Sequence, residues 1–436
     1  MMKKLMNKLN RTAAALTFLP ALRKFDPEEK DKAFYLLKRH VHNTRRFRLS
    51  EINKNYLERE ENKCQIQTSD LLYYESNQLP SNEPCEDRLL VAQVAGTETC
   101  IFSVIDGHGG WQCAHAIKHR LPYYLALYML EGAELTWRNP MTREDWILPI
   151  QGDDYNLWLE DYVFDLRTAQ SFTHRYNRKM LQNELLSVNS QLALAFEDLD
   201  EDIGTEAIPE EQRITKDTVS RLVTASSGAC CCTAVVKDGT VHVAGLGDCR
   251  AVLGSLTPEG NMRATVLTEE HRTYNPIERE RLIREHPHED EDIMFFDERL
   301  CGILQPTRAF GDVSLKWSAR EKVLMQYVFD DPAYVPNYIS PPYLSCTPDV
   351  RSTQLDQNSQ FLIIATDGLW DGMSDDESVK LIQNKPSDVN SATWLIQNSL
   401  AQHNEKRLSK ILSIPPGPIC RNVRDDISVI VIYFNT

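Results

Sequence analysis

The sequence predicts an α+β fold in which antiparallel strands alternate with helices, and three observations support this prediction. Two strand-like apolar runs, residues 230–237 and 240–245, flank Asp238-Gly239, a strong signature of a tight hairpin. Apolar side chains recur at helical spacing over residues 178–202. The 436 residues are 42% apolar and 25% charged, a globular composition whose length fits one large domain or several smaller ones.

The N-terminal segment differs in composition from the rest of the chain. Residues 1–25 carry six basic residues and no acidic residue, with leucines spaced among the basic positions. This composition is typical of a mitochondrial presequence, although a basic helical tail on a cytosolic protein would share it. Residues 26–69 are polar and rich in arginine, asparagine and glutamate, and we expect an extended or helical lead-in there.

Further elements are expected along residues 70–436. Short apolar runs bounded by turn residues predict buried strands, and a longer run that follows the first of them predicts a helix. An aromatic-rich segment at about residues 131–220 reads as an insertion packed on the core, and residues 320–345, rich in proline and aromatic residues, read as a long ordered loop. The predicted strands are residues 99–105, 361–365 and 427–434, and the predicted helix is residues 110–130.

Charge, hydropathy and cysteine content exclude several classes of protein. A net charge of −15 argues against nucleic acid as the main partner, because phosphate backbones need clustered Lys and Arg. No run of 18 apolar residues occurs, so we expect no transmembrane helix. The 11 cysteines form no CxxC pair, and Cys230-Cys231-Cys232 lies in an apolar run. We therefore expect buried thiols in a reducing compartment.

Carboxylates lie where several predicted strands end or begin. Asp106, Asp248 and Asp367 follow apolar runs, and Asp425 precedes another. In an antiparallel sheet, the end of one strand and the start of its neighbour share a rim, so these side chains could converge. Convergent carboxylates repel each other unless a hard divalent cation with oxygen ligands lies between them. The glycine after Asp106 would let a backbone carbonyl approach such an ion.

Seven short motifs give a more specific signal. In chain order they are Glu86-Asp87-Arg88, Asp106-Gly107-His108, Gly247-Asp248, Leu267-Thr268-Glu269-Glu270-His271, Arg308-Ala309-Phe310-Gly311-Asp312, Asp367-Gly368-Leu369-Trp370-Asp371 and Arg424-Asp425-Asp426. In this order the set resembles the metal-dependent protein Ser/Thr phosphatases of type 2C, over about residues 70–436. The resemblance implies a catalytic domain folded as a four-layer α-β-β-α sandwich, with two antiparallel sheets flanked by helices and metals at one rim.

The resemblance also implies roles for individual residues. Two divalent cations, Mg²⁺ or Mn²⁺, would share a water that attacks phosphorus in line, without a phosphoenzyme. Asp106 matches the carboxylate that bridges the two ions. The matching positions for the other metal ligands are Glu86, the Gly107 carbonyl, Asp367 and Asp425, with Asp87 holding metal-bound water.

Three further positions matter for the reaction. Asp248 and Asp371 match positions associated with a weaker third ion. His108 matches the general acid that protonates the leaving seryl oxygen, a role that suits a histidine pKa near working pH. Many type 2C phosphatases bind the substrate phosphate with an arginine four residues before the metal glutamate. Here that position is Asn82, which offers hydrogen bonds but no charge.

A narrower resemblance, to the pyruvate dehydrogenase phosphatases within this family, rests on the insertion and on several local stretches. They include Lys316-Trp317, Pro341-Pro342-Tyr343-Leu344 and residues 407–415. It implies a mitochondrial matrix enzyme that dephosphorylates and reactivates the E1 component of the pyruvate dehydrogenase complex. Docking on the E2 lipoyl domain and a regulatory subunit are implied as further partners.

Two alternatives remain open at this stage. The chain could be a type 2C phosphatase acting on another phosphoprotein, cytosolic if residues 1–25 are not a presequence. It could also be an inactive scaffold of the same fold, although intact Glu86, Asp106, Asp367 and Asp425 argue against that hypothesis. The polar surroundings of three other histidines predict surface positions; these are His271, His286 and His288.

Overall fold

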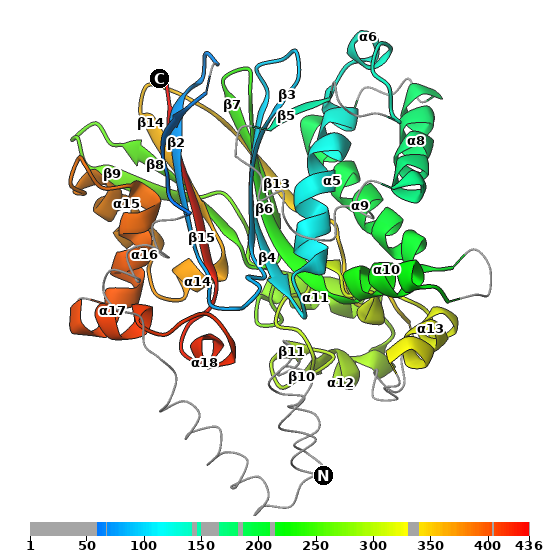
Figure 1. Ribbon diagram of the computed structural model, residues 1–436. Helices are drawn as coiled ribbons and strands as arrows, with labels where there is room; N and C mark the ends of the chain where they lie inside the picture. Colours follow the sequence, from blue (N-terminus) through cyan, green and yellow to red (C-terminus); the bar gives the residue numbers. More distant parts are fainter. Residues whose placement is uncertain are drawn as a thin grey trace, which may run out of the picture.

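Two antiparallel sheets face each other between layers of helices (Figure 1). The computed structural model describes residues 59–66, 68–141, 146–149, 165–181, 186–209, 214–329, 340–402 and 405–435. The α+β class and the four-layer sandwich are confirmed. The predicted presequence, residues 1–25, lies outside the described residues.

The first sheet has six strands in the order β1-β2-β15-β14-β8-β9. Its central strand β15 has the predicted bounds, and β14 begins two residues earlier than predicted. β1, paired with β2, extends the sheet into the segment where we expected an extended or helical lead-in. The bounds are β1 (Glu61–Gln65), β2 (Leu71–Leu79), β8 (Arg250–Leu256), β9 (Met262–Val266), β14 (Ser359–Ala365) and β15 (Ile427–Phe434).

The second sheet follows the order β13-β7-β6-β4-β3-β5, with the short β12 paired to β6. The predicted hairpin is confirmed: β6 and β7 pair from Lys237 opposite Thr240. The bounds are β3 (Arg88–Val94), β4 (Cys100–His108), β5 (Ile147–Pro149), β6 (Gly228–Lys237), β7 (Thr240–Leu246), β12 (Phe310–Gly311) and β13 (Asp349–Gln354).

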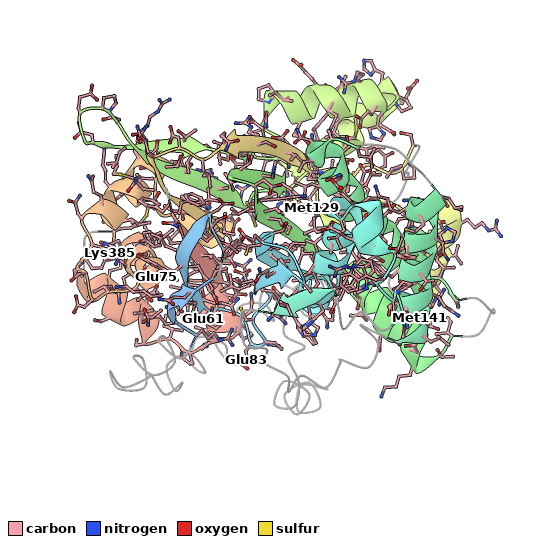
Figure 2. The ribbon with its side chains drawn as sticks, turned by 90° about the horizontal axis from the view of Figure 1, so that it is seen from above. Glu61, Glu75, Glu83, Met129, Met141 and Lys385 are labelled. Atoms are coloured by element: carbon pink, nitrogen blue, oxygen red, sulfur yellow. The ribbon has the colours of Figure 1, made fainter. Side chains whose placement is uncertain are left out.

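Helices cover the outer face of each sheet. Figure 2 shows this from above, with Lys385 on the α15–α16 side and Met141 on the α8 side. On the second sheet lie α5 (Gln112–Met129), α8 (Leu166–Leu181), α9 (Val188–Ala207) and α10 (Lys216–Ser226), with α6 (Gly132–Leu135) at one end. On the first sheet lie α14 (Asp367–Trp370), α15 (Asp375–Gln383), α16 (Ser391–Ala401) and α17 (Glu405–Leu412), whereas α18 (Pro418–Arg421) lies below α14 in Figure 1.

A small lobe lies between β9 and β13 in sequence and has its own apolar cluster around Leu282 and Met294. It contains α11 (Pro276–Glu285), η2 (His288–Asp290), α12 (Glu291–Met294), β10 (Phe295–Phe296), β11 (Arg299–Leu300) and η3 (Val313–Leu315). The next helix, α13 (Ala319–Phe329), packs instead against the apolar cluster of the second sheet and its helices, to which it contributes Met325. A separate apolar cluster lies between the two sheets, where Tyr74 and Phe102 meet edge to face.

Two predictions about local structure were wrong. The helix predicted over residues 178–202 is two helices, since α8 ends at Leu181 and α9 begins at Val188 after an N-cap hydrogen bond from Ser190 N–H to Ser187. The loop predicted from residue 320 begins instead as α13, because good helix formers precede the proline-rich part. Within the insertion, α9 packs directly on α5, so this part belongs to the helical layer over the second sheet.

Among the described residues, no helix is long and apolar enough to cross a membrane. The cysteines are unpaired, and Cys230-Cys231-Cys232 is buried along β6, as expected from the apolar run.

Candidate active site and metal centre

Three carboxylates meet at one rim of the sandwich. Asp106 lies near the end of β4, Asp248 in the turn between β7 and β8, and Asp367 at the start of α14, directly after β14. One carboxylate oxygen from each lies within 4.8 Å of the others. The two sheets contribute to the same point, as the positions at strand ends predicted.

This cluster is electrostatically unfavourable without a cation. Burial raises the pKa of Asp106 far above its usual range, and the charges of Asp87, Asp367 and Asp248 raise it further. The same causes, burial first and then Asp248 and Asp425, raise the pKa of Asp367 to about 8. A set of close oxygen donors with unfavourable negative charge fits a hard divalent cation such as Mg²⁺ or Mn²⁺.

Arg272 joins two of these carboxylates and was missed by the sequence analysis. Its Nε lies 3.0 Å from Asp248 Oδ2, and one of its terminal nitrogens lies 3.0 Å from Asp367 Oδ2. Burial alone would lower the pKa of Arg272, but the charges of Asp248 and Asp367 raise it. The Arg272 guanidinium thus offsets part of the repulsion between the two buried carboxylates, which are unfavourable without a positive charge beside them. The one sequence signal for Arg272 was its position directly after His271, the last residue of one of the seven motifs.

The loop that carries Glu86 is held by Asp426, a second residue that the sequence analysis gave no role. Asp426 accepts hydrogen bonds from the backbone N–H of Ser81, Asn82 and Glu86, the last at 2.9 Å. Burial, followed by the charge of Asp426, raises the pKa of Glu86 to about 6. A nearby cation would therefore stabilise the charged form of the Glu86 carboxylate, whose oxygens could bind that cation.

Asn82 faces inward in this loop. Its Nδ2 lies 3.2 Å from Glu86 Oε2 and 3.0 Å from Asp426 Oδ2, and the residue is 8% exposed. The asparagine amide therefore supports two carboxylates. It adds no positive charge to the site.

Asp87 lies behind the cluster between the two sheets. Thr366 Oγ1 donates to Asp87 Oδ2 at 3.0 Å and Ser428 Oγ donates at 2.8 Å. Burial, then Asp426, raises its pKa far above the usual range despite these two donors. Its position next to Glu86 suits the orienting role that the resemblance implies.

Gly107 is required by the close approach of strand β4 and the loop that carries Glu86. A Cβ at this position would lie 2.4 Å from the backbone oxygen of Glu86, a distance that no side chain can occupy. Glycine thus allows the Asp106 and Glu86 segments to meet, so that a backbone carbonyl can lie beside both carboxylates.

His108 forms a close pair with Asp312, which the sequence analysis quoted in a motif without a role. His108 Nε2 lies 2.6 Å from Asp312 Oδ2. Burial alone would lower the pKa of His108, but the charge of Asp312 and this hydrogen bond outweigh it and raise the pKa. A Cβ on Gly228 would lie 1.9 Å from Asp312 and 2.2 Å from His108, so glycine there leaves room for the pair.

The remaining predicted residues lie around this centre. Asp425 is ion-paired with Arg421 and is close enough to raise the pKa of Asp367. Asp371 is exposed and lies outside the group of three converging carboxylates found among the described residues. Its pKa is raised by burial and by Asp248, although Arg272 opposes this shift.

The prediction of three surface histidines was partly wrong. His288 is exposed and His286 is half-buried against Tyr343, but His271 is buried. Gly247 N–H donates to His271 Nδ1 at 3.1 Å, so this imidazole holds the turn that carries Asp248. Polar neighbours in sequence hid this tertiary role.

Comparison with known proteins agrees with this geometry. The Protein phosphatase 2C family profile matches residues 163–408. The human mitochondrial pyruvate dehydrogenase (acetyl-transferring) phosphatase 2 is 34% identical over 422 residues, covering 84% of this chain and 78% of that protein. The corresponding human phosphatase 1 is 32% identical over 438 residues, with the same two coverages. The chain belongs to the protein phosphatase 2C family and is a protein phosphatase.

A solved structure is also similar to this chain. The serine-threonine phosphatase 2C from Toxoplasma gondii aligns with a TM-score of 0.49 at 21% identity, over 86% of this chain and 98% of that chain.

Proposed function

We propose that this phosphatase removes phosphate from serine on the E1 component of the mitochondrial pyruvate dehydrogenase complex and thereby reactivates the complex. The observation that carries the proposal is 34% identity over 84% of the chain to a phosphatase named for that substrate, and the convergence of Asp106, Asp248 and Asp367 supports it. The acid-free basic composition of residues 1–25 supports a presequence and a location in the mitochondrial matrix.

Five groups would hold two divalent cations, Mg²⁺ or Mn²⁺: Glu86, the Gly107 carbonyl, Asp106, Asp367 and Asp425. Asp87, which lies behind these groups, would hold metal-bound water. When bound, such cations supply charge neutralisation of the phosphoryl oxygens and lower the pKa of the attacking water. Asp248 and Asp371 would contribute to a weaker third position. Arg272, which lies between Asp248 and Asp367, offers a positive charge at that same place.

The proton for the leaving serine comes from His108 in this proposal. As an imidazolium, His108 donates from Nε2 to Asp312, and Nδ1 carries the second proton, the one available to the seryl oxygen. The Asp312 carboxylate keeps the ring charged and fixes its orientation. A serine alkoxide is a poor leaving group, so this proton transfer is needed for alkyl phosphate esters in particular.

The experiment compares phosphate release from phosphorylated E1 with release from an unrelated phosphoprotein, using protein lacking residues 1–25. Faster release from E1 is expected. Equal rates would keep the phosphatase activity and contradict the substrate assignment, favouring another phosphoprotein. No release from either substrate, by a folded protein supplied with Mg²⁺ or Mn²⁺, would favour an inactive scaffold.

The implied partners extend this proposal. Docking on the E2 lipoyl domain, with or without a regulatory subunit, would bring the site close to phosphorylated E1 and raise its effective concentration. Adding the isolated E2 lipoyl domain should then lower the KM for E1 and leave kcat on a short phosphopeptide unchanged.

A further inference from the structure

A phosphatase site must bind a doubly charged phosphoryl group, and Asn82 brings no charge to that task. Its amide is also occupied, because it donates to Glu86 and Asp426 and the residue is almost fully buried. A cationic side chain elsewhere on the rim would meet the same need, since charged donors bind phosphate more strongly than neutral ones.

Among the described residues, Arg272, Arg424 and Arg421 lie next to the carboxylate centre and differ in exposure. The Arg272 side chain is 14% exposed and lies between Asp248 and Asp367. Arg424 is 9% exposed and donates to the backbone oxygen of Pro80, so it holds the chain in place. The Arg421 side chain is 40% exposed. Of these three, only Arg421 combines a position at the centre with broad access from solvent.

Arg421 is fixed beside the loop that carries Asn82. It ends the short helix α18, and at the start of that helix Gly417 N–H donates to the backbone oxygen of Ser81 at 2.7 Å. Ser81 Oγ in turn donates to the backbone oxygen of Arg424 at 2.7 Å. Two hydrogen bonds therefore tie the segment that contains Arg421, residues 417–424, to the residue directly before Asn82.

The contacts of Arg421 place its charge within reach of the proposed metal ligands. Its guanidinium is ion-paired with Asp425. Its charge lowers the pKa of Glu86, against the larger effects of burial and Asp426 that raise it. Asp425, Asp426 and Asp106 in turn raise the pKa of Arg421 against the opposing effect of burial. A phosphoryl group bound next to Asp106 and Glu86 would lie beside this guanidinium.

We propose that Arg421 on α18 is the cationic contact for the substrate phosphoryl group, in the place of the charge that Asn82 does not supply. This inference rests on the proposed phosphatase function and deepens it. The planar guanidinium can use some N–H donors on Asp425 and present others to two phosphoryl oxygens, which an asparagine amide cannot do. Arg421 thus determines affinity for the phosphoryl group and for inorganic phosphate, the product.

The test measures inorganic phosphate as the probe on the Mn²⁺-loaded protein, both as an inhibitor of phosphoserine-peptide hydrolysis and by calorimetric titration. Arg421→Gln should raise the inhibition constant and the calorimetric Kd for phosphate by about tenfold, the size of one charge-assisted contact at a half-exposed site. Arg421→Lys should retain part of the affinity. Lys410→Ala, which removes a charge from the exposed side of α17, should change neither value.

A second variant separates phosphate binding from an indirect effect through Asp425. Adding Asn82→Arg to Arg421→Gln should restore phosphate affinity, because it returns a guanidinium to the adjacent loop. Unchanged phosphate affinity in Arg421→Gln would overturn the proposal. Affinity that falls in Arg421→Gln and is not restored by Asn82→Arg would also overturn it, since Arg421 would then act only through the position of Asp425.

Failure of the phosphatase function itself would look different. A wild-type protein that hydrolyses no phosphoserine substrate would contradict the proposed function, whereas the calorimetric comparison of wild type with Arg421→Gln would still report on phosphate binding. Thermal unfolding of each variant confirms that the proteins compared are folded.

Discussion

Replacing Asp312 by asparagine tests the role of the His108–Asp312 pair. The change keeps the shape of the side chain and its ability to accept a hydrogen bond from Nε2, but it removes the negative charge that lies 2.6 Å from the imidazole. We expect His108 to remain in place and its pKa to fall, because Asp312 is the strongest of the carboxylates that oppose the effect of burial.

The expected magnitude follows from the strength of this contact. A hydrogen bond between two charged partners is worth about 1.5–3 kcal/mol. Asparagine keeps the hydrogen bond and loses its charge, so at 1.36 kcal/mol per factor of ten kcat on a phosphoseryl substrate should fall by no more than about 10- to 150-fold. The upper limit is set by general acid catalysis as a whole, about 10²–10⁴-fold, which should be lost in His108→Gln.

The assay compares two leaving groups. A phosphoseryl peptide needs a proton on the departing oxygen, whereas an aryl phosphate releases a stable phenolate and does not. Asp312→Asn should therefore lower kcat on the peptide and leave kcat on the aryl phosphate nearly unchanged. Because the pKa of His108 falls, the decline of kcat at alkaline pH should also move to lower pH with the peptide.

Two results would refute this reasoning. Equal losses on both substrates would mean that Asp312 supports the metal centre or the fold and not the proton donor. An alkaline limb at an unchanged pH would mean that the charge of Asp312 does not control the pKa of His108.

Two further predictions concern the arginines near the site. Arg272→Met removes the positive charge shared by Asp248 and Asp367, so it should lower the Tm measured in chelator by the equivalent of about 1–3 kcal/mol. Adding Mn²⁺ should then raise the Tm of Arg272→Met by more than it raises the Tm of wild type. An equal rise in the variant and in wild type would contradict this prediction. Glu278→Gln breaks a buried pair with Arg308 and should lower the free energy of unfolding at neutral pH by about 3–5 kcal/mol in urea titration. Burial alone would raise the pKa of Glu278, but Arg308 holds it well below the ordinary value of 4.5, so this stability is present above about pH 4.5 and lost as pH falls towards the lower folded pKa. A stability difference between Glu278→Gln and wild type that persists unchanged into strong acid would contradict the assignment.

The sequence was informative where an element is defined by its own residues. Strand β15 was predicted residue by residue, because it is apolar at every position except Ser428 and is buried along nearly its whole length. The convergence of Asp106, Asp248 and Asp367 was also predicted, since it depends on strand ends that the apolar runs mark.

Contacts between distant segments were not predictable in this way. The roles of Arg272 and Asp312 depend on side chains from other elements, and neither residue has a local pattern that distinguishes it from a surface charge. His271 was misplaced for the same reason, because its polar neighbours in sequence are not its neighbours in the fold. The break between α8 and α9 was missed because apolar spacing continued across it.

The family resemblance was informative where local patterns were not. It placed the two antiparallel sheets face to face and gave His108 a role, neither of which apolar spacing alone could supply. It did not indicate that Asn82 would turn inward on Glu86 and Asp426, because that orientation depends on the buried position of the loop.

The most direct test of the central claim counts bound Mn²⁺ by electron paramagnetic resonance and measures phosphate release on the same samples of wild type and Asp106→Asn. We predict two tightly bound ions and metal-dependent release from phosphorylated E1 for wild type. Asp106→Asn, with the fold retained, should lose at least one ion and nearly all release. Release by wild type that persists in chelator, or full activity in Asp106→Asn, would contradict a metal centre built on Asp106.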